Sequence, residues 1–333
     1  MRGNEYVVAE NQKLVAWKRR TPALPHEARE PGVYVAGERP PTRPLDICVP
    51  PKHAPLNLLP NVRSEALALF RELDIPWHDG VDEGPSNHLR DSQVQCVNAL
   101  HPMVRDAHRI QAAFGHLLDI ADVLPIEADR YLTFEYIGHT DYFGEGRGKA
   151  RRRGTMCTSV DAAFTYRTSR DVVELALVEW KYTETYPTAR RESSRSDAAR
   201  RRAYEPDVTD ENGPLNGSWV PFDVLLNEPF YQLVRQQLLA HRLEQDPHVA
   251  ADVVRVVHVL SPDNTAYQAC LHDFARLELG ASVDEVWTRL LRRPDRFLHL
   301  DPAVFLNPSI TSVDYVDRYG DALLTKPNDG NVT

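Results

Sequence analysis

Runs of hydrophobic residues with two different spacings predict four strands in the middle of the chain. Residues 130–137 and 158–166 alternate between apolar and polar side chains, which is typical of strands. Residues 172–182 and 253–260 are almost continuously apolar and rich in valine and leucine, as strands buried on both faces are. The short polar segment 167–171 joins the second strand to the third, so we expect these two strands to form a hairpin.

Helical spacing of apolar residues predicts helices on both sides of these strands. They are expected at residues 62–73, as two consecutive helices across 86–120, at 229–243, and at about 265–278 and 283–292. Ser86 or Asn87 is expected to cap the first helix of the consecutive pair, and Pro102 to end or kink it.

Two segments have compositions that disfavour regular structure. Ten prolines between residues 1 and 60 predict an extended arm with few regular elements, apart from a short strand at Gly32–Ala36. Residues 185–227 are rich in serine, arginine, aspartate, proline and glycine, so they are expected to form a long insertion or lid.

The order of the central elements is helix, three strands, helix, strand, and it predicts an α/β fold with a mixed sheet flanked by helices. We expect three parts: a proline-rich N-terminal arm with a short helix at 1–85, a core at 86–262, and a helical C-terminal extension at 263–333.

Charged residues interrupt the apolar third strand. Glu179 and Lys181 are two residues apart and therefore share one face of it. Asp161 lies on the polar face of the preceding strand, and hairpin pairing would bring it to within a residue or two of Glu179. Two carboxylates and a lysine are thus expected to converge, and burial in an apolar sheet requires them to have charged or metal partners.

Composition narrows the class of protein. Hydrophobic residues make up 42% and charged residues 26% of the chain, which is ordinary for a soluble globular protein. The first residues lack the apolar core of a signal peptide, and no run reaches membrane-spanning length, so a cytoplasmic protein without membrane contact is expected. The four cysteines are scattered without a CxxC pair, which argues against a zinc cage or a disulfide framework.

The net charge of −9 argues against a wholly basic nucleic-acid binder, but two basic clusters flank the predicted hairpin. They are either a phosphate-binding rim or solvated loop surface. The first cluster is Arg147, Lys149, Arg151, Arg152 and Arg153, and the second is Arg190, Arg191, Arg195, Arg200, Arg201 and Arg202.

Other motifs are weaker. The glycine-rich segment 144–149 fails as a phosphate loop, because Phe143 and Ala150 replace residues that the motif requires. His139 and Asp141 are interpreted as loop polarity, and His258 as a core histidine with a satisfied partner. Neither HExxH nor GxSxG occurs. Polar residues in the first of the paired helices are either helix-margin or functional positions, namely Ser92, Gln93 and Asn98.

Four phrases carry a resemblance to a known superfamily: DSQVQCVN at 91–98, FEYIG at 134–138, EWKYTE at 179–184 and YQLVRQ at 231–236. With the order of elements, they resemble the PD-(D/E)xK nucleases, and look closest to a group of bacterial restriction-endonuclease-like proteins. The resemblance covers about residues 86–260 and implies a restriction-endonuclease-like αβββαβ core. One departure is Val160, which stands where a proline often precedes the aspartate.

The resemblance also implies roles for individual residues. Asp161 and Glu179 would bind Mg²⁺ together with the Trp180 carbonyl, Mn²⁺ being able to substitute, and Glu135 is a further candidate ligand. Lys181 would orient or activate the attacking water, and Gln232 or Gln236 would support the site. This set suits phosphodiester hydrolysis, which needs an oxygen-ligated hard cation to neutralise charge and acidify water.

The expected function is therefore that of a Mg²⁺-dependent nuclease acting on DNA, with RNA and a homodimer left open. A restriction or defence role is implied by the resemblance alone. Two alternatives stay open: a catalytically inactive nucleic-acid-binding module on the same fold, and a structural protein in which Asp161, Glu179 and Lys181 form a buried ion network.

Overall fold

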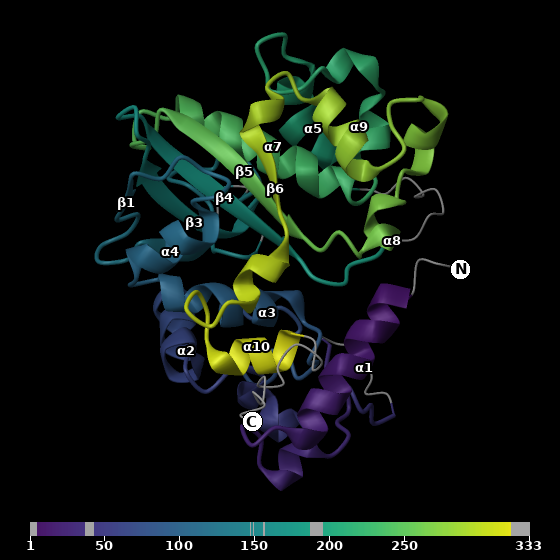
Figure 1. The fold of residues 1–333 in the computed structure, drawn as a ribbon. Helices are drawn as coiled ribbons and strands as arrows, with labels where there is room; N and C mark the ends of the chain where they lie inside the picture. The colour runs from purple at the N-terminus through teal and green to yellow at the C-terminus, as the bar shows by residue number, and fades with distance from the viewer. Residues whose placement is uncertain are drawn as a thin grey trace, which may run out of the picture.

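A six-stranded mixed sheet forms the centre of the protein (Figure 1). This computed structural model describes residues 5–36, 43–146, 148, 150–155, 157–186 and 196–320. The strand order is β1-β3-β4-β5-β6, and β2 also pairs with β3. β1 and β2 are antiparallel to β3, which is antiparallel to β4, whereas β4, β5 and β6 are parallel. The strands are β1 Asp122–Leu124, β2 Leu132–Tyr136, β3 Val160–Arg167, β4 Val173–Lys181, β5 Val253–Leu260 and β6 Phe297–Leu300.

Helices cover both faces of this sheet, as Figure 1 shows. The α-helices are α1 Glu5–Arg20, α2 Arg63–Glu72, α3 Ser92–Leu100, α4 Ala107–Phe114, α5 Asp197–Thr209, α6 Phe222–Leu225, α7 Phe230–Gln245, α8 Thr265–Gln268, α9 Val283–Leu290 and α10 Val313–Tyr319. The 3₁₀ helices are η2 His26–Arg29, η3 Pro51–Asn57, η4 His101–Met103, η5 Gly217–Trp219, η6 His272–Arg276, η7 Pro294–Arg296 and η8 Pro302–Leu306.

Alternate residues of each central strand enter two separate hydrophobic clusters. On β4, Val178 and Trp180 pack with α1, α2, α3, α4 and α10, whereas Leu175 and Leu177 pack with α5, α6, α7 and α9. Burial on both faces explains why β4 and β5 are apolar throughout. The predicted α/β fold class, a mixed sheet flanked by helices, is confirmed.

The prediction for the N-terminal segment was wrong. Residues 5–20 form the 16-residue helix α1, which precedes the first proline, Pro22, so the prolines do not restrict it. Trp17 of α1 is buried in the same cluster as Val178. The expected strand at Gly32–Ala36 is reduced to a single bridge between Gly32 and Leu45.

The C-terminal segment was also predicted incompletely. β6 extends the sheet beyond β5, although the pattern indicated only helices there. The helix expected at 265–278 is reduced to the short α8 and η6. The three-part division at residues 85 and 262 remains a proposal, and one hydrophobic cluster contains residues from all three parts.

Smaller corrections concern helix ends. Asp91, and neither Ser86 nor Asn87, caps α3, because its side chain accepts a hydrogen bond from the Val94 backbone at 2.8 Å. The second helix of the pair, α4, begins only after Asp106, whose side chain caps it. The expected insertion contains the helices α5 and α6. No helix in the described ranges is both long and apolar enough to cross a membrane.

Candidate active site

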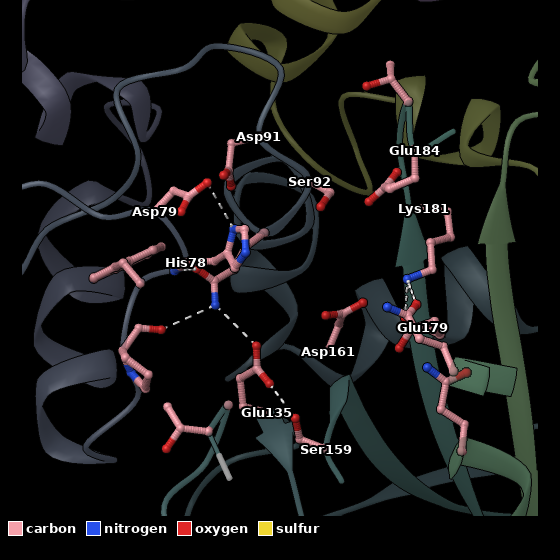
Figure 2. Close-up of a pocket in the computed structure, with 18 of the residues that line it drawn as sticks. His78, Asp79, Asp91, Ser92, Glu135, Ser159, Asp161, Glu179, Lys181 and Glu184 are labelled. Carbon is pink, nitrogen blue, oxygen red and sulfur yellow. Dashed lines mark hydrogen bonds and ion pairs between the residues drawn. The ribbon is translucent and has the colours of Figure 1, made fainter. Parts of the chain in front are cut away.

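One row of polar residues crosses the sheet. On β3, Ala162 pairs with Phe134 of β2 and with Val178 of β4, so the next position, Asp161, lies level with both Glu135 and Glu179. Residues level with one another on neighbouring strands point to the same face. Figure 2 shows the three side chains pointing toward a common space. The sheet therefore brings Asp161 and Glu179 together as the hairpin pattern predicted.

The backbone around this row departs from regular strand geometry. The ladder between β3 and β4 ends at the pair Ala162–Val178. Beyond it, the Asp161 carboxylate accepts a hydrogen bond from the Trp180 backbone at 2.7 Å. Glu135 has a φ of 47°, a left-handed conformation that costs a non-glycine residue about 1–3 kcal/mol. Conformational strain of this kind is concentrated at functional sites.

Lys181 is held at the end of β4 by two oxygens. Its ammonium group forms an ion pair with Glu179 and donates a hydrogen bond to Gln232 Oε1 at 2.6 Å. Gln232 lies in the first turn of α7, which packs on β5. Glu179 is 5% and Lys181 7% exposed, so the charged pair is almost fully buried.

Glu135 is fixed by partners that sequence analysis did not assign to the site. Gln93 donates to its carboxylate at 3.1 Å and Ser159 at 2.8 Å. The segment 91–98 and the two open interpretations of Gln93 were the available signals. Asn98, flagged with it, instead accepts a hydrogen bond from the Leu59 backbone at 2.8 Å and supports the fold.

The row lies in a cleft with a volume of about 950 Å³. Gln236 also lines it, and this buried side chain has no partner for its Oε1 among the described residues. Further lining residues that sequence analysis missed are Asp91, Arg90, Arg235, His78 and Glu184. His78 and Arg90 come from loops without a distinctive pattern, whereas Asp91, Glu184 and Arg235 fall within the phrases at 91–98, 179–184 and 231–236, which did not single them out.

Acidic groups outnumber basic groups in the row of Glu135, Asp161, Glu179 and Lys181. Burial raises the pKa of Asp161 well above its usual range, and the nearby Glu179 and Glu135 raise it further. Burial also raises the pKa of Glu135. Burial by itself would lower the pKa of Lys181, but nearby anionic groups, foremost Glu179, raise it well above its usual value. Three acidic side chains and one buried ammonium group therefore line the same cleft.

This donor set fits a hard divalent cation. The carboxylates of Glu135, Asp161 and Glu179 and the amide oxygen of Gln236 are all oxygen donors, which Mg²⁺ and Mn²⁺ prefer. A divalent cation would favour the ionised form of these carboxyl groups and would give the unpartnered Gln236 oxygen a partner, directly or through a water.

Comparison with known families agrees with this geometry. A family model described as "Restriction Endonuclease associating with ARP" matches residues 11–320. The chain belongs to this family. No curated protein and no solved structure matches it. Membership confirms the predicted restriction-endonuclease-like relationship, and the mixed sheet is compatible with that fold. A restriction-endonuclease family also indicates a nuclease role.

In this member of the restriction-endonuclease family, the described arginines of the first basic cluster form hydrogen bonds and ion pairs with other residues of the chain. Arg151 donates to the carbonyls of Ile137 and Gly138 at 2.9 and 3.1 Å. Arg152 forms an ion pair with Asp74 at 2.9 Å, and Arg153 donates to Thr133 at 2.8 Å. These guanidinium groups thus hold the loop that borders Glu135, and their binding of nucleic acid stays a prediction. Arg147, Lys149, Arg190, Arg191 and Arg195 lie outside the described residues.

The remaining candidates have local roles. Asp141 accepts hydrogen bonds from the backbone of Glu145 and Gly146 at 3.0 and 2.9 Å, as expected of loop polarity. His258 is fully buried and its Nε2 lies 3.4 Å from the Tyr267 hydroxyl. Its Nδ1, however, has no partner within the described part of the chain, so the prediction of a satisfied core histidine was only half right.

Proposed function

We propose that this protein is a Mg²⁺-dependent nuclease that hydrolyses phosphodiester bonds in DNA. The observation that carries the proposal is the row of Glu135, Asp161 and Glu179 beside the buried Lys181 in one cleft. Membership of a restriction-endonuclease family supports it. A role in restriction or defence rests on the family description alone.

Each residue of the row has a proposed task. Asp161, Glu179 and the Trp180 carbonyl hold Mg²⁺, for which Mn²⁺ substitutes, and Glu135 is a further ligand. A bound Mg²⁺ neutralises charge on the phosphate and acidifies a water molecule. Gln93 and Ser159 fix the Glu135 carboxylate. The Trp180 backbone does the same for Asp161, so the ligands are oriented before metal arrives.

Lys181 is proposed to hold the attacking water. An ammonium group is a compact cation that stabilises a developing hydroxide. Gln232 accepts one of its hydrogen bonds at 2.6 Å and so fixes the position of Nζ. Gln236, one turn further along α7, presents an unpartnered amide oxygen to the same cleft.

Two arginines of the cleft are proposed to bind the phosphates next to the scissile bond. The Nη1 of Arg90 is buried and has no hydrogen-bond partner in the described part of the chain. Arg235 also lines the cleft and donates a hydrogen bond to the Thr158 hydroxyl at 3.1 Å. A guanidinium group binds phosphate with two parallel hydrogen bonds. Arg235 also forms an ion pair with Glu145 at 3.5 Å, so a phosphate would share this arginine with Glu145 or displace it.

A cleavage assay tests the proposal and separates it from the alternatives. Plasmid DNA, linear DNA and RNA are incubated with the protein in Mg²⁺ or EDTA. The variants are Asp161→Asn and Lys181→Ala, and the control is Asp129→Asn, which changes an exposed aspartate. We expect Mg²⁺-dependent cleavage of DNA that the control retains and that both site variants lose by at least about 100-fold.

Other outcomes contradict the proposal in different ways. DNA binding without cleavage in Mg²⁺ or Mn²⁺, unchanged in both variants, would favour an inactive binding module. Absence of binding to every nucleic acid would favour the buried ion network. Cleavage of RNA alone would retain the chemistry and correct the substrate.

A further inference from the structure

A second group of ligand-type side chains lies beside the carboxylate row. His258 of β5 pairs in register with His299 of β6, so both rings lie on the same face of the sheet. Asp284 of α9 reaches them, with its Oδ2 3.5 Å from His299 Nδ1. One ligand atom from each of the three residues lies within 4.8 Å of the other two.

Two polar atoms of this group are buried and have no partner in the described part of the chain. His258 is 0% exposed, and its Nε2 is placed to share a hydrogen with the Tyr267 hydroxyl at 3.4 Å. Its Nδ1 has no partner among the residues that the structure describes, and the same holds for Asp284 Oδ1. An unsatisfied buried polar atom costs about 1–3 kcal/mol, so a ligand that satisfied both atoms would be favoured.

We propose that His258, Asp284 and His299 bind a transition-metal ion of the Zn²⁺ class. Histidine that binds a metal through one ring nitrogen usually donates its other N–H to a nearby oxygen, as Tyr267 allows here. Two imidazoles and one carboxylate suit Zn²⁺ or Co²⁺, whereas the all-oxygen row suits Mg²⁺. The two sites thus differ in chemistry.

The geometry permits such an ion if the side chains move closer together. Tetrahedral bonds of about 2.0–2.1 Å place ligand atoms roughly 3.4 Å apart, whereas the present ligand atoms lie within 4.8 Å of one another. Asp284 and His299 are partly exposed, which leaves room for water as a fourth ligand. The ion would join β5, β6 and α9 and so stabilise the edge of the sheet. His258 is level with Glu179 on the neighbouring strand, so this edge borders the active site.

Metal analysis of the untagged protein tests this site independently of nuclease activity. EDTA-treated protein is dialysed against Zn²⁺ or Co²⁺, and bound metal, the visible Co²⁺ spectrum and Tm are measured. We expect one equivalent of Zn²⁺, a tetrahedral Co²⁺ spectrum and a higher Tm. His299→Ala and Asp284→Asn change partly exposed residues and should each lower Zn²⁺ affinity on the order of 100-fold.

Two controls make the result specific. His248→Ala removes an exposed histidine outside the group and should bind Zn²⁺ as the unaltered protein does. Asp161→Asn should lose the Mg²⁺ effect on Tm and keep the Zn²⁺ effect, so failure of the proposed nuclease site would be distinguishable. The inference is overturned if Zn²⁺ does not bind stoichiometrically, or if both site variants retain the affinity of the unaltered protein.

Discussion

At the scale of a single residue, the environment of Asp161 lowers the stability of the metal-free protein. Its carboxylate is crowded by Glu179 and Glu135, which together with burial raise its pKa well above the usual range. In the unfolded chain the pKa returns to about 4. Between these two values the folded protein binds more protons, so the stability of the metal-free protein falls as pH rises.

The variant Asp161→Asn should therefore stabilise the metal-free protein at neutral pH, by about 1–2 kcal/mol. The asparagine oxygen can still accept the hydrogen bond from Trp180, so the local backbone is retained. The same variant should abolish the rise of Tm with Mg²⁺. Urea unfolding at several pH values, with and without Mg²⁺, measures both effects. A variant that is less stable without metal, or that is stabilised by Mg²⁺ as before, would contradict this account of Asp161.

At the scale of an element, helix α7 carries glutamines on two different faces, and we expect their substitution to have different effects. Gln232 lines the cleft and accepts a hydrogen bond from Lys181 at its Oε1, whereas the buried Gln237 lines a separate pocket. Gln232→Ala should lower kcat about 10-fold or more, since Lys181 loses one of its two fixed partners. Gln237→Ala should change stability alone. Single-turnover cleavage and urea unfolding distinguish the two, and equal kcat values in both variants would remove α7 from the proposed mechanism.

The loop before β3 contains two glycines, Gly154 and Gly148, whose substitution is expected to affect metal binding differently. Gly154 has a φ of 69°, and an added Cβ would lie 3.3 Å from the Glu135 carboxyl group. Gly148 has a φ of 78° with no atom within 4 Å of such a Cβ. Gly154→Ala and Gly148→Ala should thus lose similar stability, about 1 kcal/mol, through the backbone. Only Gly154→Ala should also weaken Mn²⁺ binding, measured by calorimetry, because it displaces Glu135. Equal Mn²⁺ affinity in the two variants would contradict a displacement of Glu135 by the added Cβ.

Local pattern explains which elements could be predicted from sequence. The strands from β2 to β5 and the helices α2 and α7 have clear hydrophobic spacing, and so does the hairpin that aligns Asp161 with Glu179. The length of β6 is only four residues, and its pairing with β5 depends on tertiary contacts. The proline count concealed the 16-residue α1, because composition averaged over 60 residues hides the proline-free stretch before Pro22.

The site itself was predictable only in part, because some of its residues meet only through tertiary contacts. Asp161, Glu179 and Lys181 stand out because charge is unusual within apolar strands. Gln93 and Ser159 reach Glu135 from segments distant in sequence, and the left-handed backbone of Glu135 carries no sequence signal. The group of His258, Asp284 and His299 depends on three separate elements, so spacing rules for metal ligands could not find it.

At the scale of the whole molecule, helices near the two ends of the described chain are joined by buried contacts. Arg318 of α10 is fully buried, donates to the Asn57 and Leu89 carbonyls at 2.6 and 3.0 Å, and lies 4.7 Å from the ring of Trp17. Arg318→Leu should cost about 3–5 kcal/mol, because buried carbonyls lose their donor. The exposed pair of Arg20 and Asp317 joins the same helices, and Arg20→Ala should cost less than about 1 kcal/mol.

Urea unfolding of both variants measures this coupling. A single transition that shifts for Arg318→Leu, whether followed by tryptophan fluorescence or by circular dichroism, would show that the N-terminal helix and the sheet unfold as one unit. Two separate transitions would instead support an independent N-terminal part.

The location of bound Mn²⁺ tests the central claim most directly, because the nuclease proposal depends on one ion between adjacent strands. Crystals soaked in Mn²⁺ are examined by anomalous diffraction. The account predicts a peak about 2 Å from carboxylate oxygens of both Asp161 and Glu179. At saturating Mn²⁺, a map without a peak between these two residues would contradict it.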